Sequence, residues 1–340
     1  MSALAVQSQT VLQVSDLHVD IATARGTVRA VDGVSIDVPR GEAVGLVGES
    51  GSGKSMTLRA ILGVLPAEAK ITGGQVVLDG TDLVPLPTSA LNRIRGPKLA
   101  MNFQEPMSAL NPVMRVGWQI AEGPRVHLGL SRSKAAERAV ELMRRVGIPD
   151  AERRFRAYPH EFSGGMRQRV MIAIALSCDP EVILCDEPTT ALDVTIQDQI
   201  LRLLAGLCRE SGVSLLFVTH DLPVVAQLCQ HLAVMYGGQI VERGAVEQVF
   251  AQPCHPYTLG LLRSAPDVEQ VRASLVPIPG SPPSLISPPS GCRFHPRCGF
   301  AEMDCTEQMP ELRLLPAGRS TRCLHYERCL EPLTAEGAAR

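Results

Sequence analysis

The stretch Gly48-Glu49-Ser50-Gly51-Ser52-Gly53-Lys54-Ser55 decides the fold of this 340-residue chain, because it matches the phosphate-loop pattern. An apolar run at 43–47, which predicts a buried strand, precedes it, and a helical pattern that begins at Met56 follows it. The glycines allow backbone N–H groups to turn toward phosphate oxygens, Lys54 can reach the β- and γ-phosphates, and Ser55 can bind Mg²⁺. A flexible Gly/Ser loop is the alternative, but it explains neither the strand nor the helix. We therefore expect this stretch, together with Met56, to bind a nucleotide.

Short apolar runs alternate with longer helical patterns up to about residue 250, which predicts an α/β fold with a parallel sheet. The runs at 182–185 and 215–218 have the continuous apolar character of buried parallel strands. A helix is predicted from Ser131 to Val146, because Ser131 can cap its start and Gly147 can end it. This helix indicates a helical insertion between two strand regions.

Two carboxylates, Asp186 and Glu187, directly follow the apolar run at 182–185. Ligand sites in open α/β sheets lie at the carboxyl ends of the strands, so we expect this pair near the phosphate loop. Asp186 would hold Mg²⁺ through water, and Glu187 would polarise the attacking water. An acidic turn after a strand is common in α/β proteins. The pair therefore indicates a nucleotide site only in combination with the phosphate loop.

The segment Phe162-Ser163-Gly164-Gly165-Met166-Arg167-Gln168-Arg169 resembles the signature motif of ATP-binding cassette (ABC) ATPases, with Met166 where the general family has Gln. Other segments match in family order: Gln104 resembles the Q-loop, 191–193 the D-loop and His220 the H-loop. The resemblance implies a P-loop ABC-type nucleotide-binding domain with a helical subdomain and a small Cys-rich C-terminal extension.

The signature residues Ser163, Gly164 and Gly165 open a predicted helix, so they offer a second anion site at a helix N-terminus. In the family this second surface serves a different ATP molecule, because two domains pair head to tail and the signature of one completes the phosphate-loop site of the other. The resemblance therefore implies a second ABC ATPase subunit, usually a different chain in this branch. It also places Asp193 of the D-loop among the nucleotide-binding residues.

The resemblance implies roles for individual residues. Lys54 and Ser55 bind phosphate and Mg²⁺, and Gln104 contacts Mg²⁺, senses the γ-phosphate and touches the transport partner. Glu187 is the general base. His220 contacts the γ-phosphate and helps to hold the attacking water.

This chain departs from the family pattern in the segment that would contact the base of the nucleotide. ABC ATPases usually stack adenine on an aromatic residue near the N-terminus, but no Phe, Tyr or Trp occurs before Phe103. The corresponding segment, 21–28, offers only aliphatic contacts and Arg25. We expect the base to be held weakly or by the partner subunit.

The segments 107–112 and His255-Pro256-Tyr257-Thr258 resemble one branch, the ATP-binding subunit of bacterial dipeptide and oligopeptide ABC importers. This resemblance implies an ATP-hydrolysing motor at the cytoplasmic face of the inner membrane, bound peripherally through two permease subunits and served by an extracytoplasmic peptide-binding protein. Importers of nickel and other small solutes share much of the pattern. Two different functions also stay open: a soluble ABC ATPase of DNA repair, translation or iron–sulfur assembly, and a nucleotide-regulated iron–sulfur sensor.

The charge and hydropathy of the chain exclude two kinds of direct contact. Lys+Arg 33 against Asp+Glu 35 gives 33 − 35 = −2, so binding to nucleic acid as a bulk polyanion is not expected. The longest apolar runs, such as 170–176, are far shorter than the roughly 20 residues of a membrane helix. We expect membrane contact only through the permeases.

Prolines and cysteines mark the C-terminal region. Of the 26 prolines, 13 lie from Pro253 onward, which predicts a boundary there. Together with the resemblance, this boundary implies an ATPase domain at 1–252, with its helical subdomain at about 105–180, and an extension at 253–340. The segment 277–289 is too rich in proline for a helix or a central strand. The extension has too little apolar sequence for a core of its own, so a metal centre is expected to stabilise it.

Five of the 10 cysteines fall within 38 residues near the C-terminus, from Cys292 to Cys329, which in a reducing cytosol indicates metal ligation rather than disulfides. Their spacing lacks the C-x2-C knuckle of typical structural zinc sites. Four thiolates without a histidine at the right depth suit a [4Fe–4S] cluster, as the peptide-importer branch also implies. Zinc and plain reduced thiols are the alternatives. The expected ligands are Cys292, Cys298, Cys305 and Cys323, with Cys329 as a possible substitute.

Overall fold

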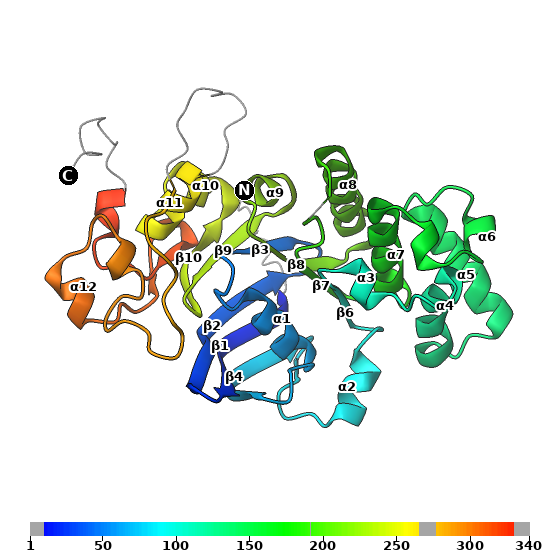
Figure 1. Cartoon of the computed structure of the whole chain (residues 1–340), viewed down its shortest axis with the longest axis horizontal. Coiled ribbons are helices and arrows are strands. Elements are labelled where there is room, and N and C mark those ends of the chain that lie inside the picture. The colour runs from blue at the N-terminus through cyan, green and yellow to red at the C-terminus, as the bar shows by residue number, and fades with distance from the viewer. Residues whose placement is uncertain (1–9, 191, 265–276, 330–340) are drawn as a thin grey trace, which may run out of the picture.

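The computed structural model describes residues 10–190, 192–264 and 277–329 (Figure 1). The strands are β1 (Thr10–Thr23), β2 (Gly26–Pro39), β3 (Ala43–Val47), β4 (Ala69–Leu78), β5 (Thr81–Asp82), β6 (Leu99–Asn102), β7 (Val182–Asp186), β8 (Ser214–Thr219), β9 (His231–Tyr236), β10 (Gln239–Ala245), β11 (Arg313–Leu314) and β12 (Ser320–Thr321).

Helices connect most of these strands. They are α1 (Lys54–Leu62), α2 (Thr88–Ile94), α3 (Pro106–Ala109), α4 (Val116–His127), α5 (Arg132–Arg145), α6 (Ala151–Arg154), α7 (Gly164–Leu176), α8 (Val194–Ser211), α9 (Leu222–Leu228), α10 (Val246–Ala251), α11 (Pro256–Ser264) and α12 (Met303–Glu307), with short 3₁₀ helices at Pro159–Glu161, His295–Arg297, Pro316–Gly318 and Tyr326–Cys329. Across the described ranges, none of these helices combines the length and the apolar character needed to cross a membrane.

The larger sheet has the strand order β11-β12-β10-β9-β3-β8-β7-β6. The strands from β9 to β6 pair in parallel, and β10, β12 and β11 add an antiparallel edge. Every residue of β3, β7 and β8 is buried, as is usual for parallel strands with both faces covered. The predicted α/β fold and the three predicted strands are therefore confirmed.

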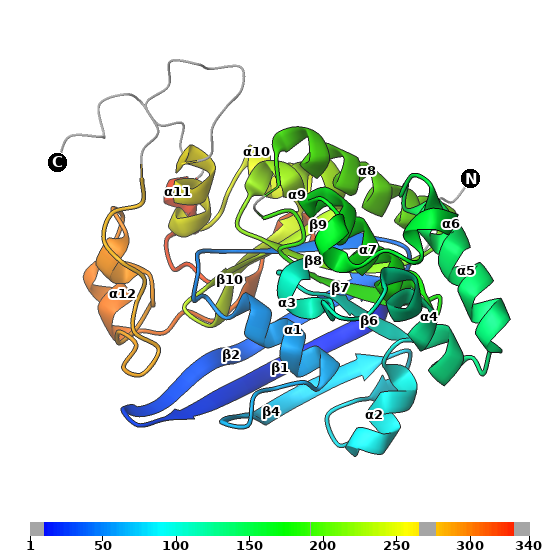
Figure 2. The ribbon, with the colours of Figure 1, turned by 45° about the vertical axis from the view of Figure 1, so that its right-hand side comes forward.

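Two hydrophobic cores lie on the two faces of this sheet. Successive side chains of β3 point to opposite faces, so Val44 and Leu46 join one core while Ala43 and Val47 join the other. The first core also contains α1 and the antiparallel sheet β2-β1-β4-β5, which forms a second layer (Figure 2). The other core contains residues of α7, α8 and α9, and it extends into α4 and α5. As a result α1, and the phosphate loop before it, is held between two sheets.

The helical subdomain and the C-terminal extension lie at opposite ends of the molecule, as α5 and α12 show in Figures 1 and 2. The helix predicted from 131 to 146 is α5, and the Ser131 hydroxyl caps it by accepting the Lys134 N–H at 3.3 Å. Its buried residues are Ala135, Ala139, Leu142 and Met143, and Ala136 and Val140 are partly buried beside them.

The C-terminal extension is joined to the larger sheet. Strand β12 pairs with β10 through Thr321 and Glu242, so the sheet continues across the boundary predicted at 252/253. The segment 277–289 forms neither helix nor strand in its described residues, as expected. Its Leu285 carbonyl accepts the Arg29 N–H at 3.2 Å, which places it along the β1–β2 hairpin.

The buried carboxyl group of Glu242, beneath this junction, makes stability depend on pH. Glu242 is 0% exposed, its Oε1 accepts the Cys254 N–H at 2.7 Å, and burial raises its pKa to about 7. Because this value lies above the ordinary 4.5, the folded state holds the proton more tightly than the unfolded chain. The bound proton therefore stabilises the folded state. This stabilisation is complete below pH 4.5 and is lost as the pH rises through about 7.

We expect Glu242→Gln to abolish this pH dependence. Relative to the variant, the wild type should lose about 3 kcal/mol of unfolding free energy between pH 4.5 and 7.5, measured by urea denaturation. The exposed Glu247, on α10, supplies the matched control, and Glu247→Gln should keep the wild-type profile. Parallel profiles for Glu242→Gln and the wild type would contradict this prediction.

Candidate nucleotide site and cysteine cavity

The phosphate loop, residues 48–55, runs from the end of β3 into the first turn of α1. Two of its glycines have no room for a side chain. A Cβ atom at Gly48 would lie 2.1 Å from the Met235 carbonyl oxygen, and one at Gly53 would lie 2.3 Å from the Ala30 carbonyl oxygen. The close approach of these backbones holds the loop at the positive end of α1, where anions bind.

Lys54 lies at the centre of the loop and is only 4% exposed. Its Nζ donates to the carbonyl oxygens of Gly48 at 2.7 Å and Glu49 at 2.9 Å. Burial lowers its pKa. The same ammonium donors can bind phosphate oxygens, since these are stronger acceptors than backbone carbonyls.

The loop residues differ in exposure. Ser50 and Gly51 are exposed, whereas Ser52 is buried and its carbonyl accepts the Gly238 N–H at 2.9 Å. Met56, in the first turn of α1, packs partly against the core between the sheets. We therefore expect Met56 to contribute its backbone N–H rather than its side chain.

A pair of oxygen ligands lies beside the loop. The Ser55 hydroxyl donates to Asp186 Oδ1 at 2.8 Å, and burial raises the pKa of Asp186. Strands β3 and β7 both run parallel to β8, so their carboxyl ends meet at one edge of the sheet. A hydroxyl and a carboxylate are the hard oxygen ligands that Mg²⁺ takes, and the two side chains fit that ion.

Three side chains converge on one oxygen of Glu187. Thr190 Oγ1 donates to Glu187 Oε2 at 2.9 Å, His220 Nδ1 shares a hydrogen bond with it at 3.2 Å, and Gln104 Nε2 donates at 3.4 Å. Glu187 also has a φ of 45°, in the left-handed region that non-glycine residues rarely adopt. The structure thus brings together the three residues predicted to be catalytic, and it adds Thr190, which no sequence motif indicated.

The signature and D-loop residues do not join this cluster. Ser163 caps α7 by accepting the Met166 N–H at 3.4 Å, and Asp193 caps α8 by accepting the Ile196 N–H at 2.9 Å. Ser163 and Gly164 are exposed, while a Cβ at Gly165 would lie 2.5 Å from Ile196 Cγ2. Within the described residues, no hydrogen bond connects the signature or Asp193 with the phosphate loop. Ala191 of the predicted D-loop lies outside the described residues.

The segment expected near the adenine forms the end of the β1–β2 hairpin, where Ile21 pairs with Val28. The C-terminal segment supplies a further aliphatic side chain here. A Cβ atom at Gly26 would lie 3.4 Å from Ile286 Cγ2. Any adenine contact with this hairpin would therefore also lie close to the extension.

All four predicted cysteine ligands line one small cavity, with a volume of about 20 Å³. Cys292 and Cys305 are linked directly, because the Cys292 N–H donates to the Cys305 carbonyl at 2.8 Å. Burial raises the pKa of Cys298 to about 11 and that of Cys323 to about 12. A bound cation would favour the thiolate forms, because metal ligation and thiol deprotonation are coupled. Cys329 is buried but does not line the cavity.

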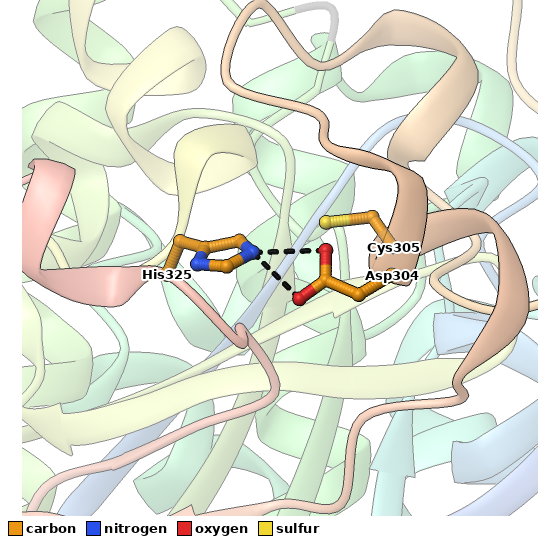
Figure 3. Close-up of side chains that lie close together, drawn as sticks. All are labelled: Asp304, Cys305 and His325. Carbon is orange, nitrogen blue, oxygen red and sulfur yellow. Dashed lines mark hydrogen bonds and ion pairs between the residues drawn. The ribbon is translucent and has the colours of Figure 1, made fainter.

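Histidines also line this cavity, which corrects the expectation that none lies at the right depth. The wall includes His255, His295 and His325. His325 Nε2 lies 2.9 Å from Asp304 Oδ2, and the ligand atoms of Asp304, Cys305 and His325 all lie within 4.8 Å of one another (Figure 3). The segment after β12 brings His325 to α12, a long-range contact that cysteine spacing does not show. Burial lowers the pKa of His255 to about 3, so that imidazole is neutral.

Comparison with known proteins matches two families along the chain. Residues 31–190 match the family "ABC transporter", and residues 241–305 match "Oligopeptide/dipeptide transporter, C-terminal region". The "Probable peptide ABC transporter ATP-binding protein y4tR" of Sinorhizobium fredii is 49% identical over 319 residues, which are 93% of this chain and 95% of the relative. The "Oligopeptide transport ATP-binding protein OppD" of Salmonella typhimurium is 46% identical over 316 residues, or 93% and 94% of the two chains.

Solved structures give the same picture for about two thirds of the chain. The dimeric structure of MJ0796, described as a bacterial ABC transporter cassette, superposes with a TM-score of 0.63 at 27% identity. It covers 69% of this chain and 98% of that chain. A post-hydrolysis dimer of the same cassette, bound to ADP and Pi, gives a TM-score of 0.61 at 28% identity and the same coverage.

Proposed function

Since this chain belongs to the ABC transporter ATP-binding family, we propose that it is the ATP-hydrolysing motor subunit of a membrane importer for di- and oligopeptides. The observation that carries the proposal is the convergence of groups at one sheet edge. The phosphate loop, the Ser55–Asp186 pair and the Glu187 cluster all lie there. The peptide assignment follows from the match of the C-terminal region and from relatives that align over more than nine tenths of the chain.

The geometry supports a separate role for each residue in ATP hydrolysis. Lys54 and the first turn of α1 hold the β- and γ-phosphates, while Ser55 and Asp186 would hold Mg²⁺, with Gln104 as its further contact. The ion would offset the negative charge of the phosphates. Water attacks the γ-phosphorus, the bond to the bridging oxygen of ADP breaks, and Glu187 accepts a proton from that water.

The hydrogen bonds around Glu187 support its role as base. Thr190, His220 and Gln104 all reach Oε2, which fixes the orientation of the carboxylate. His220 is 58% exposed at its side chain, so it can turn toward a γ-phosphate at the surface of the sheet edge. These contacts place the base in one geometry before the water binds.

The exposed signature residues support a head-to-tail pair of cassettes. Ser163 and Gly164 face solvent at the start of α7, away from the phosphate loop of the same chain, where a second subunit can reach them. In this arrangement ATP closes the pair, and closure drives the permeases. The other subunits would be a different ABC ATPase chain, two transmembrane permeases and an extracytoplasmic peptide-binding protein, with no nucleic acid.

The location of the protein tests this function. We expect the native chain to remain with the membrane fraction at low salt, on the cytoplasmic face of the inner membrane, and to co-purify with two permeases. ATP hydrolysis by the purified complex should rise when a peptide-loaded binding protein is added. Free release of the chain at low salt without permeases would contradict the importer assignment.

The cysteine cavity supports a [4Fe–4S] cluster as a resident group of the extension, which we assign to 253–340, with the ATPase domain at 1–252. Four thiols from separate segments face one cavity, a donor set that suits iron–sulfur ligation. The cluster would join these segments of the extension. Zinc at Asp304, Cys305 and His325 is the alternative that the geometry raises. Anaerobic purification followed by iron, sulfide and zinc analysis decides between them, and stoichiometric zinc without iron would overturn the cluster.

A further inference from the structure

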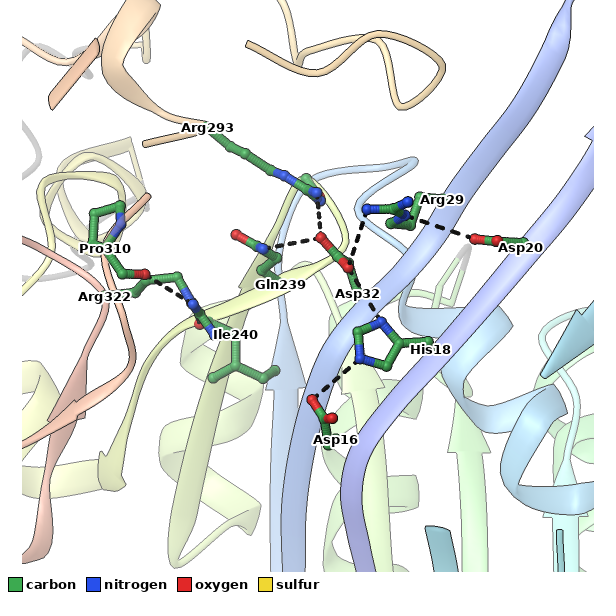
Figure 4. A network of polar contacts seen from close by, with 11 residues as sticks. Asp16, His18, Asp20, Arg29, Asp32, Gln239, Ile240, Arg293, Pro310 and Arg322 are labelled. Carbon is green, nitrogen blue, oxygen red and sulfur yellow. Dashed lines mark hydrogen bonds and ion pairs between the residues drawn. The ribbon is translucent and has the colours of Figure 1, made fainter. Parts of the chain in front are cut away.

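Arginines adjacent to the cavity cysteines tie the extension to the ATPase domain. Arg293 follows Cys292 in the sequence and pairs with Asp32 on β2 (Figure 4). Arg322 precedes Cys323, and its Nε donates to the Ile240 carbonyl on β10 at 3.1 Å. Each cysteine segment is therefore anchored to a strand of the ATPase domain through the neighbouring residue.

The third arginine, Arg297, is anchored to the phosphate loop itself. It precedes Cys298, and its two terminal nitrogens donate to Glu49, at 2.7 Å to Oε2 and 3.1 Å to Oε1. The Arg297 side chain is only 6% exposed, and its Nε also donates to the Pro279 carbonyl at 2.7 Å. A two-point pair shielded from solvent fixes both distance and orientation, unlike a surface ion pair. Glu49 is the residue whose carbonyl accepts a hydrogen bond from Lys54.

An aromatic cluster forms a second connection between the cavity and the loop. The Glu49 N–H donates to the Tyr257 hydroxyl at 2.8 Å. The Tyr257 ring packs on Phe294 with ring centres 5.4 Å apart, and Phe294 lies 5.8 Å from the His255 ring. Phe294 and His255 line the cysteine cavity, and all three rings are buried. One wall of the cavity is thus in continuous contact with Glu49, the second residue of the phosphate loop.

We propose that Arg297 and Tyr257 position the phosphate loop through Glu49, so that an intact cysteine centre is required for full nucleotide affinity. This inference rests on the proposed function for the nucleotide and the metal, and adds a coupling between them. A loop rich in glycine loses conformational freedom when it closes on phosphate. Contacts that hold it beforehand remove part of that cost. If the cysteine segments separate, Arg297 moves with Cys298 and the loop loses its support.

Arg297→Gln and Glu49→Gln test the positioning on the full chain. Each should raise the Kd for a fluorescent ATP analogue about tenfold, because the loop loses a charged two-point contact that orders it before phosphate binds. The double variant should be no worse than the single ones, since both remove the same pair. Arg297→Lys keeps the charge but loses the two-point geometry, and it should give an intermediate Kd.

Arg293→Gln is the matched control. It breaks the ion pair of the neighbouring anchor with Asp32, which does not involve the phosphate loop. We expect a lower Tm but a Kd within about twofold of the wild type, because no contact to Glu49 is lost. If Arg297→Gln and Arg293→Gln lower the Tm and raise the Kd equally, the Arg297–Glu49 ion pair only attaches the extension to the ATPase domain. That result would overturn the proposal.

Metal removal tests the coupling. Extraction of iron from the wild type by a chelator, and separately Cys298→Ser, should raise the Kd by the same factor as Arg297→Gln, with no further rise in the Arg297→Gln background. An unchanged Kd after complete iron loss would overturn the coupling. A wild type without metal would instead refute the proposed cluster, while the Arg297 and Glu49 variants would still decide whether the pair positions the loop.

Discussion

Glutamine in place of Glu187 is expected to lower steady-state ATP hydrolysis by about 10²–10⁴-fold while leaving ATP affinity within about twofold of the wild type. The amide has nearly the size of the carboxylate, and its oxygen can still accept the hydrogen bonds from Thr190 and Gln104. It has no basic site for the proton of the attacking water. Binding is preserved because Lys54 and the start of α1 hold the phosphates independently of this side chain.

The measurement is phosphate release by the assembled complex, together with equilibrium binding of ATP to the same preparation. Glu181, just before β7, offers a matched control, because it lies at the opposite end of the strand and pairs with Arg40 at 3.0 Å. Glu181→Gln should hydrolyse ATP at the wild-type rate. Near-normal turnover by Glu187→Gln would remove Glu187 as the general base.

Serine in place of Cys323 should eliminate the bound metal and expose the extension to proteolysis. A serine hydroxyl is a poor substitute for a thiolate, and the free energy of metal binding in such small regions is also folding free energy. In the described residues of the extension, helices and strands are few and short. We therefore expect rapid cleavage within the extension while the ATPase domain survives, as measured by limited proteolysis, alongside iron and sulfide analysis.

Two further variants identify the metal. His325→Ala should leave iron and sulfide stoichiometric if four thiolates bind a cluster, whereas it should release zinc bound by Asp304, Cys305 and His325. Cys208→Ser is the matched control, because this half-buried cysteine on α8 lies outside the cavity. It should keep both the metal and the resistance to protease. Full metal content in the Cys323→Ser protein would contradict the proposed ligand set.

The local parts of the nucleotide site could be predicted from the sequence, because their chemistry depends on residues close together in the chain. The spacing of Gly48, Gly53 and Lys54 defines a strand, a loop and a helix start within a few residues, and the structure contains β3 and α1 at those positions. The apolar run before Asp186 likewise predicted a strand. The four cavity cysteines could be identified as a set because they crowd one region, even though their ligand geometry could not be derived.

Only the tertiary structure decided which distant residues meet. Gln104, Glu187 and His220 belong to three separate segments, and their contact at one oxygen depends on the parallel order of β6, β7 and β8. The histidines of the cysteine cavity and the joining of β12 to the ATPase sheet arise in the same way. Arg297 and Glu49 are 248 positions apart, and their ion pair exists because packing of the whole chain brings the cysteine segment to the phosphate loop. Spacing along the chain reports local backbone geometry, whereas contacts between segments depend on how strands pair and helices pack.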